Sequence, residues 1–247
     1  MTIDRPDFSD IPALKALWKE AFGDPDDFLD AFFANGFLPA CSRCCRMENT
    51  PVAVLYWFDC ECRGEKLAYL YAIATAKNHQ GKGLCRTLMD DTHKLLKQLG
   101  YAGCVLVPGS ESLFRFYEKA GYRTFGTIRE FSCAASNTPA PMHQIDSDEY
   151  ARLRRQYLPA GSVLQEGAVL SFLQTQAKFY AGNDFVFVVT GDRIAELLGS
   201  TAAAGDILSA LQLPSATIRT VGSDKPFAMY YPLTQKTPPE YFGLALD

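Results

Sequence analysis

The feature of the sequence that most constrains the fold is a loop with two glycines, placed between a strand-like and a helix-like segment. An apolar run that ends at Thr75 leads through Gln80-Gly81-Lys82-Gly83 into an amphipathic pattern at residues 83–99. Glycine lets the backbone approach a ligand closely, and the first turn of a helix presents unpaired N–H groups at the positive end of its dipole. This order of elements therefore predicts an anion site suited to a pyrophosphate.

Two common phosphate-binding motifs do not fit this loop. A Walker loop needs Gly-x4-Gly-Lys followed by Ser or Thr, and the dinucleotide fingerprint needs Gly-x-Gly-x-x-Gly; the loop matches neither. A glycine-rich turn that binds nothing is the simpler interpretation of an isolated Gly-Lys-Gly. The surroundings of the loop therefore have to decide between a binding site and a turn.

The flanking segments predict a first half of helices and strands around this loop. Ser9 is the expected N-cap of the first helix, and Pro25 is the expected first residue of the second. Turn residues at 48–51 and 63–65 join three strands into an antiparallel meander. The expected elements are helices at 10–22 and 25–35, strands at 41–47, 52–60 and 67–75, a helix at 83–99 with Leu84, Leu88, Leu95 and Leu99 on its buried face and Gly100 as its cap, a strand at 105–107, a helix at 110–120 and a strand at 122–128.

The second half follows a segment at residues 133–146 that is rich in proline and small polar residues, and we expect a linker there. The elements expected beyond it are helices at 147–157 and 165–179, strands at 185–190 and 193–197, a helix at 206–211 and three further strands. This order loosely repeats the first half and suggests a degenerate internal duplication. The second half lacks the two-glycine pattern, and Asp206 is interpreted as a helix cap there.

Two motifs resemble those of the GNAT acetyltransferases. Gln80 to Cys85 resemble the family's Gln/Arg-x-x-Gly-x-Gly/Ala signature, and Phe114 to Tyr122 resemble its Leu-Tyr-x-x-x-Gly-Phe segment. The resemblance covers residues 3–127 and implies an α+β protein with the GNAT fold, in which helices flank a mixed, mostly antiparallel sheet. The expected domains are an acetyltransferase domain at 1–132, the linker at 133–146, and a smaller, degenerate GNAT-like or accessory α/β domain at 147–247.

The resemblance also implies a site for acetyl-CoA, which would be a co-substrate. The pantetheine arm would lie along the backbone of Ile73, Ala74 and Thr75. The residues expected to hold the pyrophosphate are Gln80, Gly81, Lys82, Gly83, Leu84, Cys85 and Arg86. Ser110, which takes the place of the family's Asn, is also expected to bind the cofactor, and Cys85 departs from the family's Gly or Ala. Because Cys85 starts a helix, we expect its thiol to be unusually acidic and oxidisable.

Acetyl transfer needs a proton donor for the departing thiolate, and Tyr117 resembles the family's general acid. Tyr117 also belongs to an apolar helical stripe, so a packing role is the alternative. The sequence does not indicate which residue is the general base. Tyr69 and Tyr71 alternate with Leu70 and are expected to line the acceptor pocket together. The candidates for the base are a water relay and the C-terminal carboxylate of Asp247. The three histidines, His79, His93 and His143, are expected at surface or linker positions and are not assigned to catalysis.

Composition restricts the partners. The net charge of −4 argues against nucleic acid, and neither a signal peptide nor an apolar span is evident, so a cytoplasmic protein without membrane contact is expected. The eight cysteines include Cys41-x-x-Cys44 and Cys60-x-Cys62. Their irregular spacing, and the strand alternation that points Cys44 and Cys45 to opposite faces, favour small buried hydrophobes over a metal site.

Together these features predict an acetyl-CoA-dependent N-acetyltransferase that acts on a primary amine of a small molecule or a peptide. The alternatives are a non-catalytic module that binds or senses acyl-CoA, and an enzyme that uses a longer acyl-CoA. The second half is expected to shape the acceptor site and to bind no second CoA. Its aromatic end, Phe227, Tyr230, Tyr231, Tyr241 and Phe242, is either sheet core or a cover for that site. The oligomeric state is left open.

Overall fold

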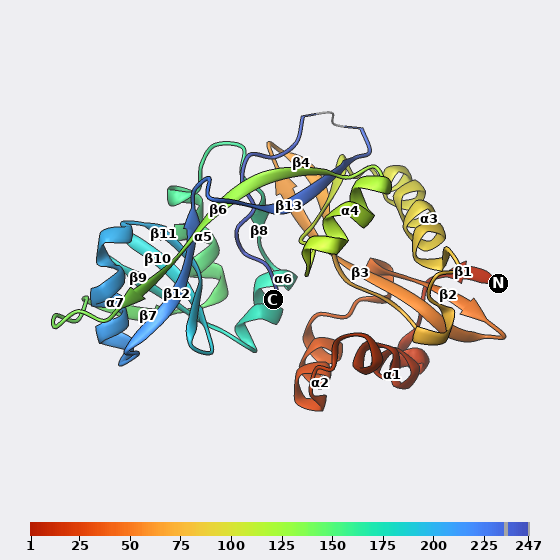
Figure 1. Ribbon diagram of the computed structural model, residues 1–247, viewed down its shortest axis with the longest axis horizontal. Helices are drawn as coiled ribbons and strands as arrows, with labels where there is room; N and C mark the ends of the chain where they lie inside the picture. The colour runs from red at the N-terminus through yellow and green to blue at the C-terminus, as the bar shows by residue number, and fades with distance from the viewer. Residues whose placement is uncertain (235–236, 247) are drawn as a thin grey trace. The chain divides into compact units, whose positions relative to one another are not determined.

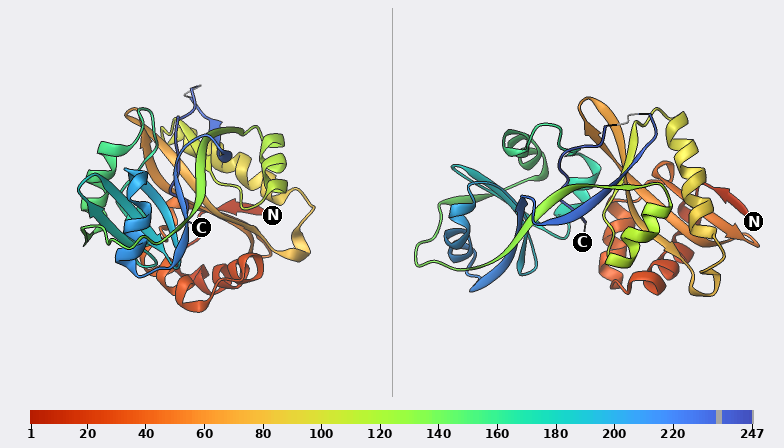
Figure 2. Two further views of the ribbon diagram at one scale, coloured as in Figure 1. Left: turned by 60° about the vertical axis from the view of Figure 1, so that its left-hand side comes forward. Right: turned by 45° about the horizontal axis from the view of Figure 1, so that its top comes forward.

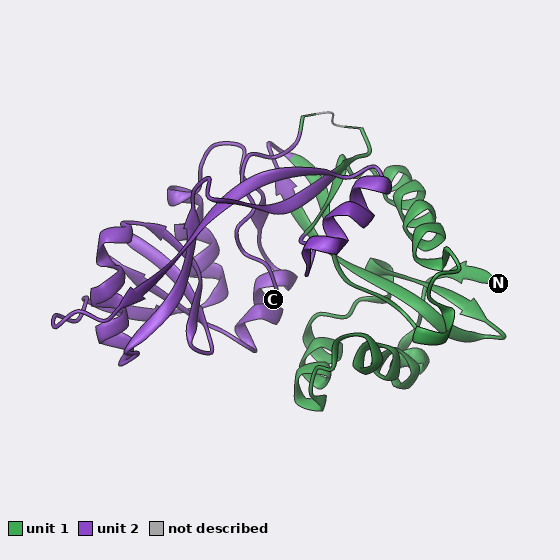
Figure 3. Ribbon diagram, in the orientation of Figure 1, with its two compact units in different colours: residues 1–60, 65–106, 231–237 green, residues 61–64, 107–230, 238–247 purple. Residues whose placement is uncertain are grey.

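The computed structural model of the chain describes residues 1–234 and 237–246 (Figure 1). It divides into two compact units, which Figure 3 shows in different colours. Unit 1 comprises Met1–Cys60, Glu65–Leu106 and Tyr231–Thr237, and unit 2 comprises Glu61–Gly64, Val107–Tyr230 and Pro238–Asp247. The long continuous part of unit 1 thus ends at Leu106. The expected domain bounds, 1–132, 133–146 and 147–247, stay predictions.

Unit 1 is a sheet with helices on both faces, in the strand order β1-β2-β3-β4-β5. The pairs β1–β2 and β2–β3 are antiparallel, and β4 pairs with β5 in parallel. Helices α1 and α2 lie on one face and α3 lies on the other (Figures 1 and 2). The elements are β1 (Thr2–Asp4), α1 (Ile11–Phe22), α2 (Asp26–Asn35), β2 (Ser42–Met47), β3 (Thr50–Cys62), β4 (Glu65–Thr75), α3 (Leu84–Gln98) and β5 (Gly103–Leu106).

Aromatic side chains fill the space between the sheet of unit 1 and helices α1 and α2. Trp18 of α1 and Phe32 of α2 have ring centroids 4.7 Å apart, and the ring of Tyr56 on β3 lies 5.0 Å from that of Phe32. Residues 52–58 of β3 are all buried, since helices cover both faces of this strand. The core of unit 1 thus holds β3 and β4 at the centre of its sheet.

The strands of unit 2 follow the order β13-β6-β12-β11-β10-β9-β7. Neighbouring strands are antiparallel except β11 and β12, which are parallel and are connected through α7. The elements are α4 (Glu111–Lys119), β6 (Arg123–Ala134), β7 (Met142–Ile145), α5 (Ser147–Tyr157), β8 (Leu164–Gln165), α6 (Ala168–Gln174), β9 (Lys178–Gly182), β10 (Phe185–Thr190), β11 (Arg193–Gly199), α7 (Ala204–Leu211), β12 (Ser215–Val221) and β13 (Lys225–Pro232).

The two units repeat one topology. The series β1-α1-α2-β2-β3-β4-α3-β5 corresponds to β7-α5-α6-β9-β10-β11-α7-β12, apart from the short β8. Both series have the same strand order, and each ends in a parallel pair that encloses a helix. This agreement supports the internal duplication suggested by the sequence, even though few residues are shared. It also confirms the expected mixed, mostly antiparallel sheet architecture flanked by helices.

The first turn of α7, which corresponds to the helix that follows the glycine loop, is covered by the chain after β6. Ser136 N–H donates to Gly205 O at 2.9 Å, and Ala140 N–H donates to Asp206 O at 2.9 Å. A Cβ added to Gly205 would lie 3.2 Å from the carbonyl oxygen of Ala134. Asp206 is not the cap that we expected: it lies within the first turn, and its carboxylate accepts a hydrogen bond from the Ser136 hydroxyl.

Several element boundaries differ from the sequence expectation in unit 2. Residues 165–179 do not form one helix: they contain the end of β8, then α6, and the start of β9. Phe179 pairs with Val188 in the sheet, so this tertiary pairing ends the helix earlier than periodicity suggests. The expected linker is also partly structured, because residues 133–134 extend β6 and residues 142–145 form β7. After α7, the described residues contain β12 and β13 rather than three strands.

Helix ends in unit 1 differ in detail. Ser9 is not the N-cap of α1; that position is Asp10, which makes no side-chain cap bond. Asp7 caps the preceding 3-10 turn, Phe8–Asp10: its carboxylate accepts Ser9 N–H, and its own N–H donates to the Asp10 carboxylate. Pro25 is the N-cap of α2 rather than its first helical residue. Leu99 is 55% exposed because α3 ends at Gln98, and Gly100 takes the expected left-handed conformation beyond it. The short strand β1 carries too few residues to show a period and was not expected.

Candidate functional site

The end of β4 is the first component of the site. The parallel ladder with β5 runs through Leu67, Ala68 and Tyr69, and Ala72 then adopts a left-handed backbone with φ of +47°. Ile73, Ala74 and Thr75 therefore lie beyond the last β5 pairing, while Ala76 N–H still donates to Val52 O on the β3 side at 2.9 Å. An extended ligand with amide groups would find strand backbone at this edge.

The two glycines shape the loop that follows. Gly81 and Gly83 have φ of +73° and +78°, a conformation that residues with a Cβ adopt only with strain. A Cβ at either position would meet no heavy atom within 4 Å, so the backbone here borders open space. The Gln80 side chain donates to Thr75 O at 3.0 Å, and Lys82 Nζ donates to Asn78 O at 2.8 Å. These two hydrogen bonds hold the side chains of Gln80 and Lys82 against the preceding segment, residues 75–78.

The N-terminus of α3 completes the phosphate loop, by which we mean Gln80 to Arg86. Thr87 N–H is bonded to Gly83 O at 3.0 Å, whereas the earlier N–H groups of an α-helix have no acceptor within the helix. The first turn of α3 contains no acidic residue. Arg86 is half-exposed and forms an ion pair with Asp90 at 3.1 Å. The arrangement suits an anion because N–H groups, the helix dipole and basic side chains meet there.

Cys85 does not have the acidic thiol that we expected. Burial raises the pKa of the Cys85 thiol to about 11, so the group is protonated at neutral pH. Desolvation of the thiolate thus outweighs the favourable position at a helix N-terminus. Cys85 acts at this loop as a small apolar side chain beside the buried Leu84.

Tyr117 and Ser110 belong to unit 2. Tyr117 lies on α4, is 8% exposed, and packs its ring edge-on against Tyr122 with a centroid distance of 5.7 Å. Ser110 occupies the N-cap position of α4 without capping it, and its hydroxyl lies 3.0 Å from that of Ser112. The catalytic role of Tyr117 and the ligand contact of Ser110 stay predictions.

One side of β4 carries Tyr69 and Tyr71, the two tyrosines that were expected to share a face. The rings of Tyr69 and Tyr71 lie 6.2 Å apart, and both lie near Phe58. Tyr71 is half-buried and its ring lies 5.6 Å from that of Trp18 on α1. This confirms that Tyr69 and Tyr71 share a face; that they line an acceptor pocket stays a prediction.

The histidines take three different environments. His143 is exposed on β7, as expected, and His79 is half-buried beside the phosphate loop. His93 is 4% exposed rather than on the surface, because it stacks on Tyr231 with centroids 3.9 Å apart. Burial lowers the pKa of His93 to about 4, so this imidazole is neutral at physiological pH. Asp247, whose carboxylate was a candidate base, lies outside the described residues.

Among residues 1–234 and 237–246, no group of three or more His, Cys, Asp or Glu side chains is placed to hold a metal ion. Cys44, Cys45, Cys60 and Cys62 are buried free thiols. Burial raises the pKa of Cys45 and of Cys62 above the ordinary thiol value.

One hydrogen bond next to the loop could not be predicted from the sequence. Glu20, on the last turn of α1, accepts a hydrogen bond from Lys77 N–H at 3.1 Å. The two residues are 57 positions apart, and nothing in the pattern of either segment links them. The left-handed Ala72 was missed for a similar reason, since alanine usually marks an ordinary backbone position.

The comparison with known protein families decides what this arrangement is. Residues 2–125 match the model of the acetyltransferase (GNAT) domain, which is half of the chain. The chain belongs to the GNAT acetyltransferase family. The loop at Gln80, the parallel β4–β5 pair and α3 therefore lie within the matched domain of this GNAT protein.

Solved structures share the fold over nearly the whole chain. A GCN5-related N-acetyltransferase from Anabaena variabilis has a TM-score of 0.71 at 16% identity, over 94% of this chain and 72% of its own. One from Kribbella flavida gives 0.70 at 12%, over 94% and 71% of the two chains. A putative acetyltransferase from Pyrococcus horikoshii gives 0.70 at 13%, over 99% and 94%. No curated protein matches the chain.

No helix in the described part of the GNAT chain is long and apolar enough to cross a bilayer.

Proposed function

We propose that this GNAT protein binds acetyl-CoA at the phosphate loop and transfers the acetyl group to a primary amine. The observation that carries the proposal is the pair of left-handed glycines, which border open space at the N-terminus of α3. The N–H groups of residues 81–86 would bind the pyrophosphate. Ile73, Ala74 and Thr75, which lie past the β5 ladder, would bond the pantetheine arm through their backbone.

The proposed reaction is attack of an amine nitrogen on a thioester carbonyl, with formation of an N–C bond and cleavage of the C–S bond. Acetyl-CoA supplies the activated acetyl group. The Tyr117 hydroxyl donates a proton to the departing sulfur and regains one from solvent, while the proton released by the amine passes to water. A neutral amine is required, so activity should rise with pH as the acceptor deprotonates.

The test is release of free CoA from acetyl-CoA with a panel of polyamines, amino acids, aminoglycosides and peptide N-termini. At least one class should give release that depends on both substrates, and a donor series from acetyl to succinyl then defines the acyl preference. Binding of acetyl-CoA without release of CoA for any amine would contradict the enzyme and favour a non-catalytic module that binds acyl-CoA.

The second candidate is a non-catalytic module that binds or senses acyl-CoA. It is favoured by the side chains on the acceptor face of β4, where Tyr69 and Tyr71 lie beside the aromatic core. A phenol, with an ordinary pKa near 10, is a poor general base at neutral pH. The module would bind acetyl-CoA with the same loop and would give no thiol release.

A further inference from the structure

A side chain of α1 holds the segment that leads into the phosphate loop. A short 3-10 turn, η3 (Lys77–His79), lies between the end of β4 and Gln80. Its N-cap is Ala76, which has no side-chain acceptor and makes no side-chain cap. The carboxylate of Glu20 instead accepts the hydrogen bond from Lys77 N–H, at 3.1 Å. Glu20 therefore caps η3 from a different element of unit 1.

The position of Glu20 on α1 is not explained by the helix itself. Glu20 is exposed and lies in the last turn, just before the Gly23 C-cap. The carbonyl end of a helix carries a partial negative charge, which disfavours a carboxylate and favours Lys or Arg. Among residues 1–234 and 237–246, the carboxylate of Glu20 has one hydrogen-bond partner, Lys77 N–H, and no ion pair. The contact that accounts for a glutamate at this position is thus the one to η3.

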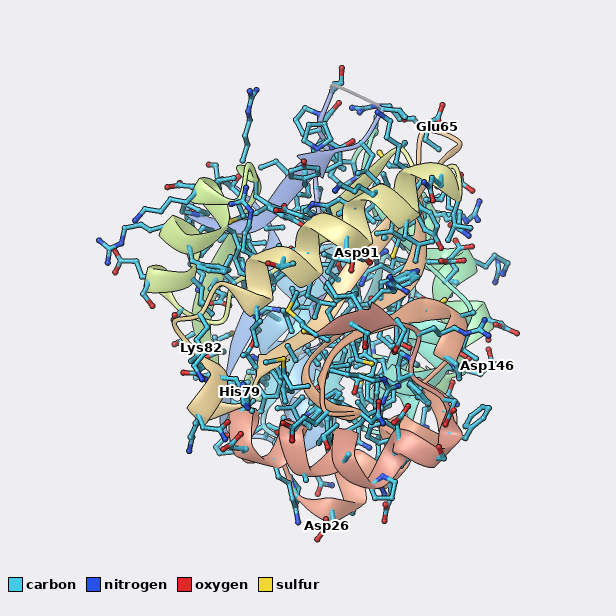
Figure 4. All side chains as sticks on the ribbon, turned by 90° about the vertical axis from the view of Figure 1, so that its right-hand side faces the viewer. Asp26, Glu65, His79, Lys82, Asp91 and Asp146 are labelled. Carbon is cyan, nitrogen blue, oxygen red and sulfur yellow. The ribbon has the colours of Figure 1, made fainter. Side chains whose placement is uncertain are left out.

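The turn η3 is in turn bonded to the phosphate loop. Gln80 N–H donates to Lys77 O at 3.3 Å, which fixes the first residue of the loop on the turn. Asn78 O, in the middle of η3, accepts a hydrogen bond from Lys82 Nζ at 2.8 Å. Figure 4 shows His79, the last residue of η3, and Lys82 at one edge of unit 1. A shift of η3 would therefore displace both the start of the loop and the side chain of Lys82.

We propose that Glu20 is a positioning residue for the cofactor, which holds η3 so that the phosphate loop is already formed before acyl-CoA binds. This role rests on the proposed function, which assigns the pyrophosphate to the loop. A site that is formed in advance binds more tightly, because less conformational entropy is lost on binding. Glu20 acts by accepting a hydrogen bond and not by its charge, since a negative charge near the loop opposes the binding of an anion.

Calorimetric titration of the full chain with acetyl-CoA tests this role. Glu20→Ala removes the acceptor and should raise the dissociation constant about three- to tenfold, the effect of losing one hydrogen bond. Glu20→Gln keeps an acceptor oxygen without the charge, so it should bind acetyl-CoA at least as tightly as the parent chain. The matched control is Glu65→Ala, which removes an exposed carboxylate far from His79 in Figure 4 and should bind like the parent.

Steady-state release of CoA separates positioning from a part in the chemistry. In Glu20→Ala the KM for acetyl-CoA should rise, while kcat at saturating acetyl-CoA should stay within about twofold of the parent value, because only ground-state binding is weakened. Thermal melting without ligand shows whether the variant folds like the parent chain. A fall in kcat as large as the rise in KM would overturn the positioning role.

Three binding results would also overturn the proposal: an unchanged constant in Glu20→Ala, an equal rise in Glu65→Ala, or equal weakening in Glu20→Ala and Glu20→Gln. The last result would mean that the charge of Glu20 carries the effect. Failure of the parent chain to bind acetyl-CoA would refute the proposed function instead. Amide hydrogen exchange without ligand would then still decide whether Glu20 holds the segment, since exchange at residues 77–83 should be faster in Glu20→Ala than in Glu20→Gln.

Discussion

At the scale of single residues, Gly83 is where backbone conformation and ligand binding meet. Gly83→Asp adds a like charge and bulk beside the proposed pyrophosphate and should abolish acetyl-CoA binding. Saturating ligand should stabilise the parent chain by about 2.7 kcal/mol at a hundredfold excess over its dissociation constant, measured as a thermal shift. The control is Gly64→Asp, because Gly64 has the same φ of +78° and equally open surroundings in the β3–β4 turn. If acetyl-CoA fails to shift the melting of the parent chain, the proposed site is wrong.

Tyr117 offers a second residue-scale test. Tyr117→Phe keeps the ring that packs on Tyr122 and removes only the hydroxyl, so folding and acetyl-CoA binding should persist. Turnover should fall by about 10²–10⁴-fold, the usual contribution of general acid catalysis. The check is steady-state CoA release with the best amine acceptor, beside a calorimetric binding constant for acetyl-CoA. Unchanged turnover would assign Tyr117 to packing alone.

His93 makes stability depend on pH. Its pKa is lowered to about 4, chiefly by burial and partly by Arg86, while Asp90 opposes the shift. Between pH 6.5 and 4 the unfolded chain binds a proton that the folded chain does not, so the free energy of unfolding falls as pH falls. At pH 5 the loss is about 2 kcal/mol relative to pH 7. Urea unfolding at both pH values should show a smaller loss in His93→Phe, and an equal loss would remove His93 as the cause.

At the scale of elements, α3 and α7 occupy corresponding places but differ at their first turns. The start of α3 borders open space, whereas residues 134–140 cover the start of α7 and bond to Gly205 and Asp206. We therefore predict one acetyl-CoA per chain by calorimetry. A stoichiometry of two would contradict the assignment of α7 as a closed site.

Elements also show how far the sequence alone can reach. The phosphate loop, α3 and the β3–β4 hairpin were predictable, because glycine positions and apolar periodicity are local signals. The segment 165–179 was not, since Phe179 joins β9 through pairing with a strand that lies later in the chain. The hydrogen bond between Glu20 and Lys77 was not predictable for the same reason, because it forms only when α1 packs on the sheet.

At the scale of the whole molecule, β6 sets the limit on truncation. Residues 128–134 of β6 pair with β12, and residues 123–128 pair with β13, so the strand is held by two partners from late in the sequence. Both partners are lost when the chain is cut after residue 136, so we predict that a fragment of residues 1–136 lacks a cooperative thermal transition, measured by circular dichroism. A folded fragment with full acetyl transfer would contradict this prediction.

The aromatic residues near the end of the chain bear on the role of unit 2. Phe227, Tyr230, Tyr241 and Phe242 are buried, and the Tyr241 hydroxyl lies 3.2 Å from the carboxylate of the buried Glu196. These side chains serve as core of unit 2, which favours the packing interpretation. A part for unit 2 in choosing the acceptor amine stays a proposal.

The covered start of α7 has an evolutionary consequence. Once residues 134–140 close a helix terminus that its counterpart keeps open, natural selection for phosphate binding no longer acts on that half of the duplication. Substitutions there are then constrained by folding alone. Among descendants of the same ancestral duplication, the positions around Thr201–Ala203 should vary widely, while Gly81 and Gly83 should stay glycine.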